Sequence, residues 1–217
     1  SLPEDMLRES TSAVPEPRVE VVERAPSGED VAAVREALSA AERPVLLVGG
    51  GGWTEAGLAD LRSFAGRNDL PVVVTFRRHD LFDNTDDRYA GEAGVAMPAA
   101  VRRALEEADL VVVLNARFGE MATGTYTLFG SGSSQRPAGQ SIVHVHSSVA
   151  EFGKVADADL TVWDRLEAYG NAGRRALGAG NHLPQLGHTH RHDGAASPAL
   201  SVSPPARPRR HDHRRHR

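Results

Sequence analysis

Short runs of apolar residues alternate along the chain with longer segments in which apolar residues recur every third or fourth position. The runs predict buried strands at residues 45–48, 72–75, 110–114 and 142–145, with a weaker candidate at 160–162. The longer segments predict amphipathic helices that begin near Ser27, Thr54 and Pro98. Continuous apolar strands that alternate with such helices favour a mostly parallel sheet covered on both faces. The pattern therefore predicts a doubly wound, Rossmann-like α/β domain over residues 27–164.

Each predicted helix has an apolar face, and two have a recognisable start. Ser27 can cap the first helix with Asp30 as its capping-box partner. Pro98 suits the first turn of the third helix, where its missing N–H is not needed. The apolar faces consist of Val31, Val34, Leu38 and Ala41, then of Leu58, Leu61 and Phe64, and finally of Val101, Leu105 and Ala108.

Composition adds limits to this picture. The chain has 217 residues, of which 40% are hydrophobic, so it can fill one domain with its own core. The absence of cysteine removes disulfides and thiolate chemistry and fits a cytoplasmic protein. Neither a run of about 18 apolar residues nor a signal-peptide pattern is found in the sequence. We therefore expect neither a membrane span nor export.

Charge divides the chain into two unlike parts. Residues 1–160 contain 15 Lys and Arg against 25 Asp and Glu, a net charge of −10, whereas residues 161–217 contain 10 against 4, a net charge of +6. The second part also holds seven of the ten histidines. Because it lacks periodic apolar sequence, burial cannot offset the entropy of ordering it. We expect residues 165–217 to be a disordered basic tail with no specific nucleic-acid contact.

Ligands of parallel sheets bind outside the carboxyl ends of the strands, so the residues at these ends are the candidate binding residues. They are Gly49, Gly50 and Gly51, Thr75 and Phe76, Asn115, Ala116 and Arg117, and His146 and Ser147. The glycines permit close backbone approach, and the helix beyond them favours an anion. The dinucleotide fingerprint G-x-G-x-x-G is only partly met, because Thr54 or Glu55 stands at its last position. The glycines can equally serve only a tight strand-to-helix turn.

Several side chains near the strand ends have two interpretations. Arg117 can bind a phosphate through its guanidinium group or pair with Glu120 at the surface. Phe76 can stack on a ring system or pack in the core. His144 and His146 share a strand face, but no third metal ligand stands nearby in the sequence. We therefore expect no metal site, and we identify no catalytic residue.

Six stretches follow one another in a characteristic order. They are L-P-E-D-M-L, R-P-V-L-L-V-G-G-G-G-W, L-P-V-V-V-T-F-R-R-H-D-L-F-D-N, Y-A-G-E-A-G, A-D-L-V-V-V-L-N-A-R-F-G-E-M-A-T-G-T-Y-T-L-F and I-V-H-V-H. Together they resemble the middle domain of thiamine-diphosphate-dependent enzymes of the acetolactate synthase-like type, over residues 1–164. The resemblance implies that residues 1–26 are the end of a preceding domain plus a linker.

The resemblance also implies a parent enzyme that joins or cleaves bonds next to the carbonyl of a 2-keto acid, with thiamine diphosphate and Mg²⁺. In this family the activating glutamate belongs to the first domain and a G-D-G…N-N motif to the third, and residues 1–217 contain no G-D-G. The chain is then an inactive central-domain fragment, whose partners are the remaining domains or subunits of a homo-oligomeric enzyme. The basic tail, in place of a third domain, has the composition of an out-of-frame translation.

Some middle domains of the family bind FAD, others bind an ADP-containing ligand, and many bind neither. The ten candidate residues named above match by position the stretches that contact the dinucleotide in flavin-binding members. The sequence departs from these members at Asn115, where their G-x-R begins, and at His146, where an acidic residue is common. Two alternatives to the fragment therefore stay open: a stand-alone FAD- or ADP-binding module, and a structural domain for assembly.

Overall fold

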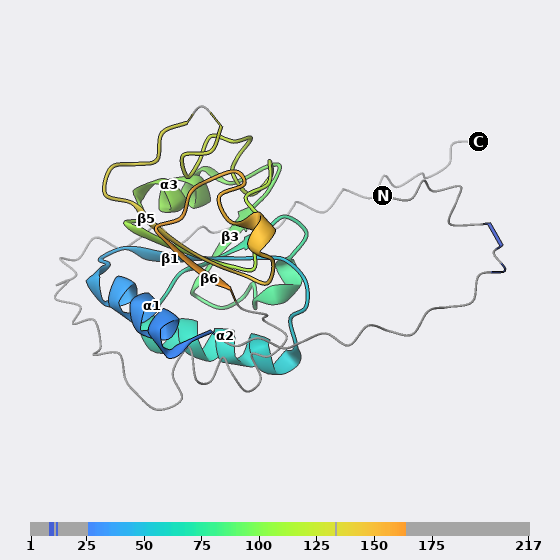
Figure 1. Cartoon of the computed structure of the whole chain (residues 1–217), viewed down its shortest axis with the longest axis horizontal. Helices are drawn as coiled ribbons and strands as arrows, with labels where there is room; N and C mark the ends of the chain where they lie inside the picture. The colour runs from blue at the N-terminus through green and yellow to red at the C-terminus, as the bar shows by residue number, and fades with distance from the viewer. Residues whose placement is uncertain (1–8, 11, 13–25, 133, 164–217) are drawn as a thin grey trace, which may run out of the picture. The chain divides into compact units, whose positions relative to one another are not determined.

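The computed structural model describes residues 9, 10, 12, 26–132 and 134–163 (Figure 1). These residues include nearly all of the α/β domain predicted from the sequence. The expected linker in residues 1–26 lies almost entirely outside the described residues, and the expected tail, residues 165–217, lies wholly outside them.

Six strands of the described chain form one sheet, in which every neighbouring pair is parallel. The strands are β1 (Pro44–Val48), β2 (Val72–Thr75), β3 (Tyr89–Ala93), β4 (Leu110–Leu114), β5 (Ser141–His146) and β6 (Leu160–Trp163). Their order across the sheet is β3-β2-β1-β4-β5-β6. This is the order of the doubly wound fold with two βαβαβ halves. The predicted α/β fold is confirmed, and the sheet is wholly parallel.

Helices cover both faces of this sheet. They are α1 (Gly28–Ala40), α2 (Glu55–Asn68) and α3 (Ala99–Glu107), with single turns of 3-10 helix at η2 (His79–Leu81) and η3 (Val149–Glu151). Figure 1 shows α1 and α2 on one face and α3 on the other, in agreement with the two separate cores. Within the described residues, no helix has both the length and the apolar character needed to cross a membrane.

Side-chain caps explain where α1 and α2 begin. The predicted capping box is confirmed, because Ser27 Oγ accepts the Asp30 N–H at 3.0 Å while Asp30 Oδ2 accepts the Ser27 N–H at 2.9 Å. In α2, Thr54 Oγ1 accepts the Gly57 N–H at 3.1 Å. Each cap satisfies an N–H group that has no partner within the helix and stabilises it by about 1 kcal/mol.

Two hydrophobic cores lie on opposite faces of the sheet, because successive strand residues point in opposite directions. Leu46 and Leu47 are adjacent in β1, and both are fully buried, but they belong to different cores. Such burial contributes roughly 2 kcal/mol for each side chain. The core under α1 and α2 also contains Val34, Leu38, Leu61, Phe64, Val74, Val112 and Val145, and the core under α3 also contains Val73, Val101, Leu105, Val113 and Ile142.

The hydrophobic pattern did not predict β3. Its sequence Y-A-G-E-A has no apolar run, and only Ala93 in it is buried, because β3 is an edge strand. Gly91 has a φ of 124°, and a Cβ there would lie 2.6 Å from Val101 Cγ2 of α3. The strand is therefore stabilised by its pairing with β2 and by the close packing of Gly91 against α3.

A long loop, residues 115–140, connects β4 to β5, and none of its described residues forms a helix. It covers the α3 face with Phe118, Leu128 and Phe129, all of them buried. The rings of Phe118 and Phe129 lie 5.3 Å apart between centroids. These side chains therefore contribute to the core under α3 although the loop contains no regular element among its described residues.

Three consecutive residues of this loop have left-handed backbone angles. The φ values of Gly124, Thr125 and Tyr126 are 56°, 61° and 58°. The left-handed conformation costs a non-glycine residue roughly 1–2 kcal/mol, and it is rare in a β-branched residue. Hydrogen bonds hold it in place, because the Thr125 N–H donates to Glu120 O at 2.7 Å and the Tyr126 N–H donates to Thr123 Oγ1 at 3.0 Å.

Candidate functional site

β1 and β4 are neighbours at the centre of the sheet, and the chain leaves them in opposite directions, from β1 toward β2 and from β4 toward β5. At such a switch point the loops diverge, which opens a crevice at the carboxyl ends of the strands. A cavity of about 750 Å³ lies at this place. Its volume is within the range of small-molecule and cofactor sites.

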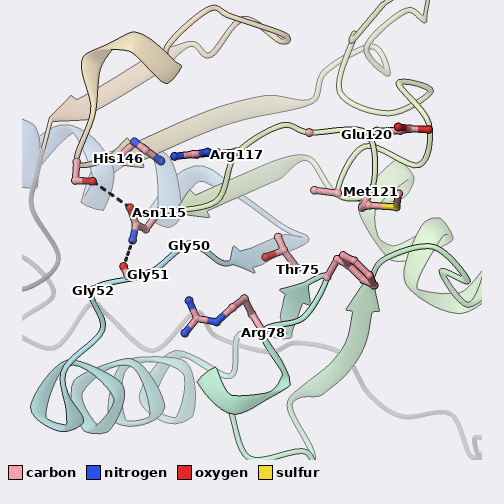
Figure 2. A pocket seen from close by; sticks show the side chains of 14 residues that line it. Gly50, Gly51, Gly52, Thr75, Arg78, Asn115, Arg117, Glu120, Met121 and His146 are labelled. Atoms are coloured by element: carbon pink, nitrogen blue, oxygen red, sulfur yellow. Dashed lines mark hydrogen bonds between the residues drawn. The ribbon is translucent and has the colours of Figure 1, made fainter. Parts of the chain in front are cut away.

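The ends of four strands and the loops after them line the cavity (Figure 2). The lining residues are Gly50, Gly51 and Gly52 after β1, Thr75, Phe76 and Arg78 at β2, Asn115, Arg117 and Gly119–Ala122 after β4, and His146 and Ser147 at β5. Eight of the ten candidate residues are among them, whereas Gly49 and Ala116 lie behind the lining. The other lining residues are Gly52 and Arg78, which directly extend two of the candidate stretches, and Gly119–Ala122, which sequence reasoning missed because a loop without periodicity does not indicate where it lies.

The glycines of the first turn have different roles. A Cβ on Gly49 would overlap Thr75 Oγ1, and a Cβ on Gly50, whose φ is 67°, would overlap the carbonyl oxygen of Asn115. No described atom lies within 4 Å of a Cβ built on Gly51. The fold of the turn therefore requires Gly49 and Gly50, whereas Gly51 leaves space in which another molecule can approach the backbone.

Asn115 joins three strand ends beneath the cavity. Its backbone N–H donates to Val145 O at 2.8 Å, and its side-chain Nδ2 donates to Gly51 O at 2.6 Å. Its Oδ1 accepts a long hydrogen bond from Ser147 Oγ at 3.5 Å. The left-handed φ of 54° is one that asparagine tolerates better than most residues. The amide therefore crosses the crevice between the turn after β1 and the end of β5.

Arg117 provides the more available positive charge of the cavity. Its side chain is 73% exposed, and its Nε lies 3.7 Å from Glu151 Oε1. The expected pairing with Glu120 is wrong, because the nearest carboxylate comes from η3, which sequence spacing cannot reveal. Because Arg117 is solvent-exposed and the Nε–Oε1 distance is long, the pair contributes little to stability, so Arg117 can turn to a ligand. Arg78, by contrast, binds Asp80 through two hydrogen bonds of 3.0 and 2.9 Å.

Phe76 lies at the wall of the cavity and belongs to neither core. It is 36% exposed, so the expectation that it packs in the core is wrong. Its backbone N–H donates to Ala93 O at 3.0 Å, which turns the residue outward past the end of β2. The guanidinium carbon of Arg77 lies 5.0 Å from the ring centroid. A ring in this position can stack on a planar group.

His146 is a neutral hydrogen-bonding group at the floor of the cavity. Its Nδ1 lies 2.9 Å from Ser148 N and 3.3 Å from Ser148 O. In the neutral ring Nδ1 accepts the Ser148 N–H, which puts the proton on Nε2. Burial lowers the pKa of His146, and the nearby Ser148 carbonyl oxygen, to which a protonated Nδ1 can donate, opposes this to a smaller extent. At neutral pH it therefore offers a donor without a charge.

His144 lies behind the cavity and is fully buried. Its Nε2 is 2.9 Å from Ala116 O, which can only accept, so Nε2 carries the proton. Its Nδ1 has no hydrogen-bond partner among the described residues. Burial is the main cause that lowers the pKa of His144 to about 4. The rings of His144 and His146 lie 5.6 Å apart, and the described residues contain no group of three His, Cys, Asp or Glu that could hold a metal.

Comparison with known proteins shows which family this chain resembles. The family described as "Thiamine pyrophosphate enzyme, central domain" matches residues 31–170. The acetolactate synthase large subunit of Parasynechococcus marenigrum is 33% identical over 132 residues, which are 61% of this chain and 20% of that protein. The acetolactate synthase isozyme 2 large subunit of Escherichia coli is 27% identical over 139 residues, 64% of this chain and 24% of that protein.

A relative with a different name shares the same region. The 3D-(3,5/4)-trihydroxycyclohexane-1,2-dione hydrolase of Lacticaseibacillus casei is 31% identical over 120 residues, which are 54% of this chain and 18% of that protein. The chain thus spans between 18% and 24% of the length of these three relatives.

Proposed function

The chain belongs to the thiamine pyrophosphate enzyme central domain family, and from this membership we propose that it serves an acetolactate synthase-like enzyme that joins or cleaves bonds next to the carbonyl of a 2-keto acid. The observation that carries the proposal is the family match, which extends over all six strands of the sheet. Two of the named relatives are acetolactate synthases and support the same assignment.

Thiamine diphosphate does not fit the residues of this chain. Residues 1–217 contain no G-D-G, and the described residues contain no cluster of metal ligands. When bound in the whole enzyme, the cofactor supplies carbanion stabilisation. A synthase and a hydrolase both share this region, which supports a division of labour in which the flanking polypeptide selects the reaction. We therefore propose that the central domain is not catalytic by itself and acts together with the other domains or subunits.

The first prediction concerns activity. The purified 217-residue chain, supplied with thiamine diphosphate, Mg²⁺ and a 2-keto acid, is expected to release no carboligation or decarboxylation product, because it lacks the G-D-G motif and its described residues lack a metal-ligand cluster to hold the cofactor through Mg²⁺. The measurement is product formation, with the Escherichia coli isozyme assayed in parallel as a positive control. Turnover by the 217 residues alone would contradict the proposal. So would flanking DNA that encodes no G-D-G…N-N domain in any reading frame.

The cavity favours a second role, the binding of an ADP-containing ligand or FAD. The backbone at Gly51 is open, and Arg117 is an exposed cation of the same cavity lining, so these two residues would hold a diphosphate. Phe76 would contact a planar ring, and Ser147 would offer a hydroxyl group. This role is compatible with the central-domain assignment and does not depend on catalysis by the chain.

The second prediction tests this role with a pair of arginine variants. Arg117→Gln is expected to weaken ADP or FAD binding about tenfold, because it removes a charge-assisted hydrogen bond to the diphosphate. Arg103→Gln, which changes an exposed arginine of α3 outside the cavity, is expected to leave the affinity unchanged. The measurement is isothermal titration. If the wild-type chain binds neither ligand at millimolar concentration, the nucleotide role is wrong and the family assignment is unaffected.

A further inference from the structure

The end of β2 lacks the acidic side chain that ordinarily binds the ribose of a dinucleotide. In a doubly wound sheet with this strand order, the diphosphate lies at the turn after β1. A carboxylate at the end of the next strand then accepts a hydrogen bond from the ribose 2′-hydroxyl group. Here the last residue of β2 is Thr75. It is followed by Phe76, Arg77 and Arg78, so two arginines stand where the carboxylate is expected.

A carboxylate from the neighbouring strand, Glu92 of β3, does not replace the missing one. Its Oε1 accepts the Arg77 N–H at 3.3 Å, and its Oε2 lies 3.3 Å from His79 Nε2. Glu92 is not among the residues that line the cavity. Among the described residues that do line it, Glu120 is the one carboxylate, and it belongs to the loop after β4. A ribose at the end of β2 would therefore meet no carboxylate of the described lining.

Arg78 is a donor with a fixed orientation at this place. Its side chain is 23% exposed and lines the cavity. Asp80 binds one edge of the guanidinium group, because it accepts from Nε at 3.0 Å and from Nη2 at 2.9 Å. Nη1 is not part of this pair, and Figure 2 shows the Arg78 side chain extending toward the glycine turn after β1. Because Asp80 already orders the guanidinium group, a ligand that binds it loses little further entropy.

Cations outnumber carboxylates in the cavity lining, although residues 1–160 have a net charge of −10. The described lining contains Arg78 and Arg117 against Glu120. Asp80 is 64% exposed, so water screens its repulsion of an anion bound to Arg78. Because β1 lies between β2 and β4 in the sheet, the two arginines approach the glycine turn from opposite sides. The lining therefore offers a separate guanidinium group to each of two phosphate-bearing parts of a ligand.

We propose that the cavity prefers an adenine nucleotide whose ribose carries a phosphate group, at its 2′ or 3′ oxygen, in addition to the diphosphate. The proposal rests on the nucleotide-binding role of the cavity. Arg117 and the open backbone at Gly51 hold the diphosphate. Phe76 contacts the adenine, and Arg78 binds the ribose phosphate through charge-assisted hydrogen bonds. An arginine near this position is what doubly wound domains use to accommodate a 2′-phosphate.

The test uses three ligands that differ only in the ribose phosphate: ADP, ADP with an added 2′-phosphate, and ADP with an added 3′-phosphate. Isothermal titration of the 217-residue chain is expected to give an affinity about tenfold higher for at least one of the phosphorylated forms than for ADP. The form that binds more tightly identifies the ribose oxygen.

Variants then assign the preference to Arg78. Arg78→Gln is expected to reduce the tenfold ratio of affinities to about one. Arg78→Lys, which keeps the charge but loses the planar fork, is expected to reduce it to about threefold. Arg103→Gln, outside the cavity, is expected to keep the full ratio. Arg117→Gln is expected to weaken all three ligands by a similar factor, because it acts on the diphosphate. Both affinities of a ratio are measured on the same protein, so a partly unfolded variant does not imitate a lost preference.

Three outcomes overturn the proposal in different ways. Equal affinity of the wild-type chain for all three ligands overturns the preference and leaves the nucleotide-binding role intact. A preference that survives Arg78→Gln, or that Arg117→Gln abolishes equally, shows a general attraction of the extra charge and overturns the assignment to Arg78. If none of the three ligands binds at millimolar concentration, the nucleotide-binding role and the preference are both wrong, and the family assignment is unaffected.

Discussion

Gly50→Ala is expected to lower the free energy of unfolding by about 3 kcal/mol, although it adds a single methyl group. The φ of Gly50 is 67°, where an alanine is strained, and the new Cβ would overlap the carbonyl oxygen of Asn115 and lie 2.8 Å from its Nδ2. This carbonyl belongs to Asn115, whose backbone N–H donates to Val145 O of β5. The Asn115 backbone therefore cannot move away without weakening its hydrogen bond to the sheet.

The neighbouring residue supplies the matched control. Gly51→Ala adds the same methyl group where no described atom lies within 4 Å and where φ is not positive, so its effect is expected to stay within about 0.5 kcal/mol. Urea denaturation of both variants measures the difference. Because the main obstacle is a backbone carbonyl, Asn115→Ala is not expected to rescue Gly50→Ala. Equal stabilities of the two glycine variants would show that the turn does not depend on this contact.

Between about pH 8 and about pH 4.5, His144 alone is expected to reduce the stability by about 2.5 kcal/mol. Its pKa is about 4 in the folded protein, below the usual histidine value of 6.5, chiefly because burial disfavours the charged ring. The unfolded chain therefore binds a proton at higher pH than the folded protein does. The stabilisation is fully present above the unfolded pKa and is lost as the pH falls toward about 4. His146, whose pKa burial also lowers, acts in the same direction.

A histidine replacement separates this effect from other acid effects. His144→Gln keeps an N–H that can donate to Ala116 O but removes the titration, so its unfolding free energy is expected to fall much less over the same pH range. The carboxyl groups of Asp80, Asp83 and Asp86, whose pKa values hydrogen bonds lower, act at still lower pH. If the unfolding free energy of His144→Gln fell as much as that of the wild type over this pH range, the loss of stability could not be assigned to His144.

Local sequence was sufficient to predict most of the fold. The runs at β1, β2, β4 and β5 are apolar because both faces of these strands are covered, and each was predicted within a residue or two of its observed bounds. β3 escaped prediction because an edge strand needs no apolar run. The conformation of Thr125 and Tyr126 escaped as well, because neither residue type favours a positive φ.

The candidate site was predictable only in outline. The rule that ligands bind at strand ends located the region, because it depends on topology alone. The direction of each side chain depends on partners distant in sequence. Asn115 is held by Gly51, 64 positions away, and Arg117 is paired with Glu151 of another segment. Gly49 and Gly51 both belong to the glycine run after β1, and the sequence does not distinguish them. In the structure Thr75 and Ala116 enclose Gly49, which does not line the cavity.

The loop between β4 and β5 bonds mainly to itself, as in the hydrogen bonds from the Thr123 and Leu128 N–H groups to Gly119 O and Thr123 O. Its amides can therefore exchange with solvent through local opening, whereas those of β1 and β4 exchange only when the whole sheet unfolds. Gly119–Ala122 on one wall of the cavity thus belong to a weaker cooperative unit than Asn115 at its floor. A molecule bound between wall and floor would join the two units and slow exchange in a loop that the sheet itself does not protect.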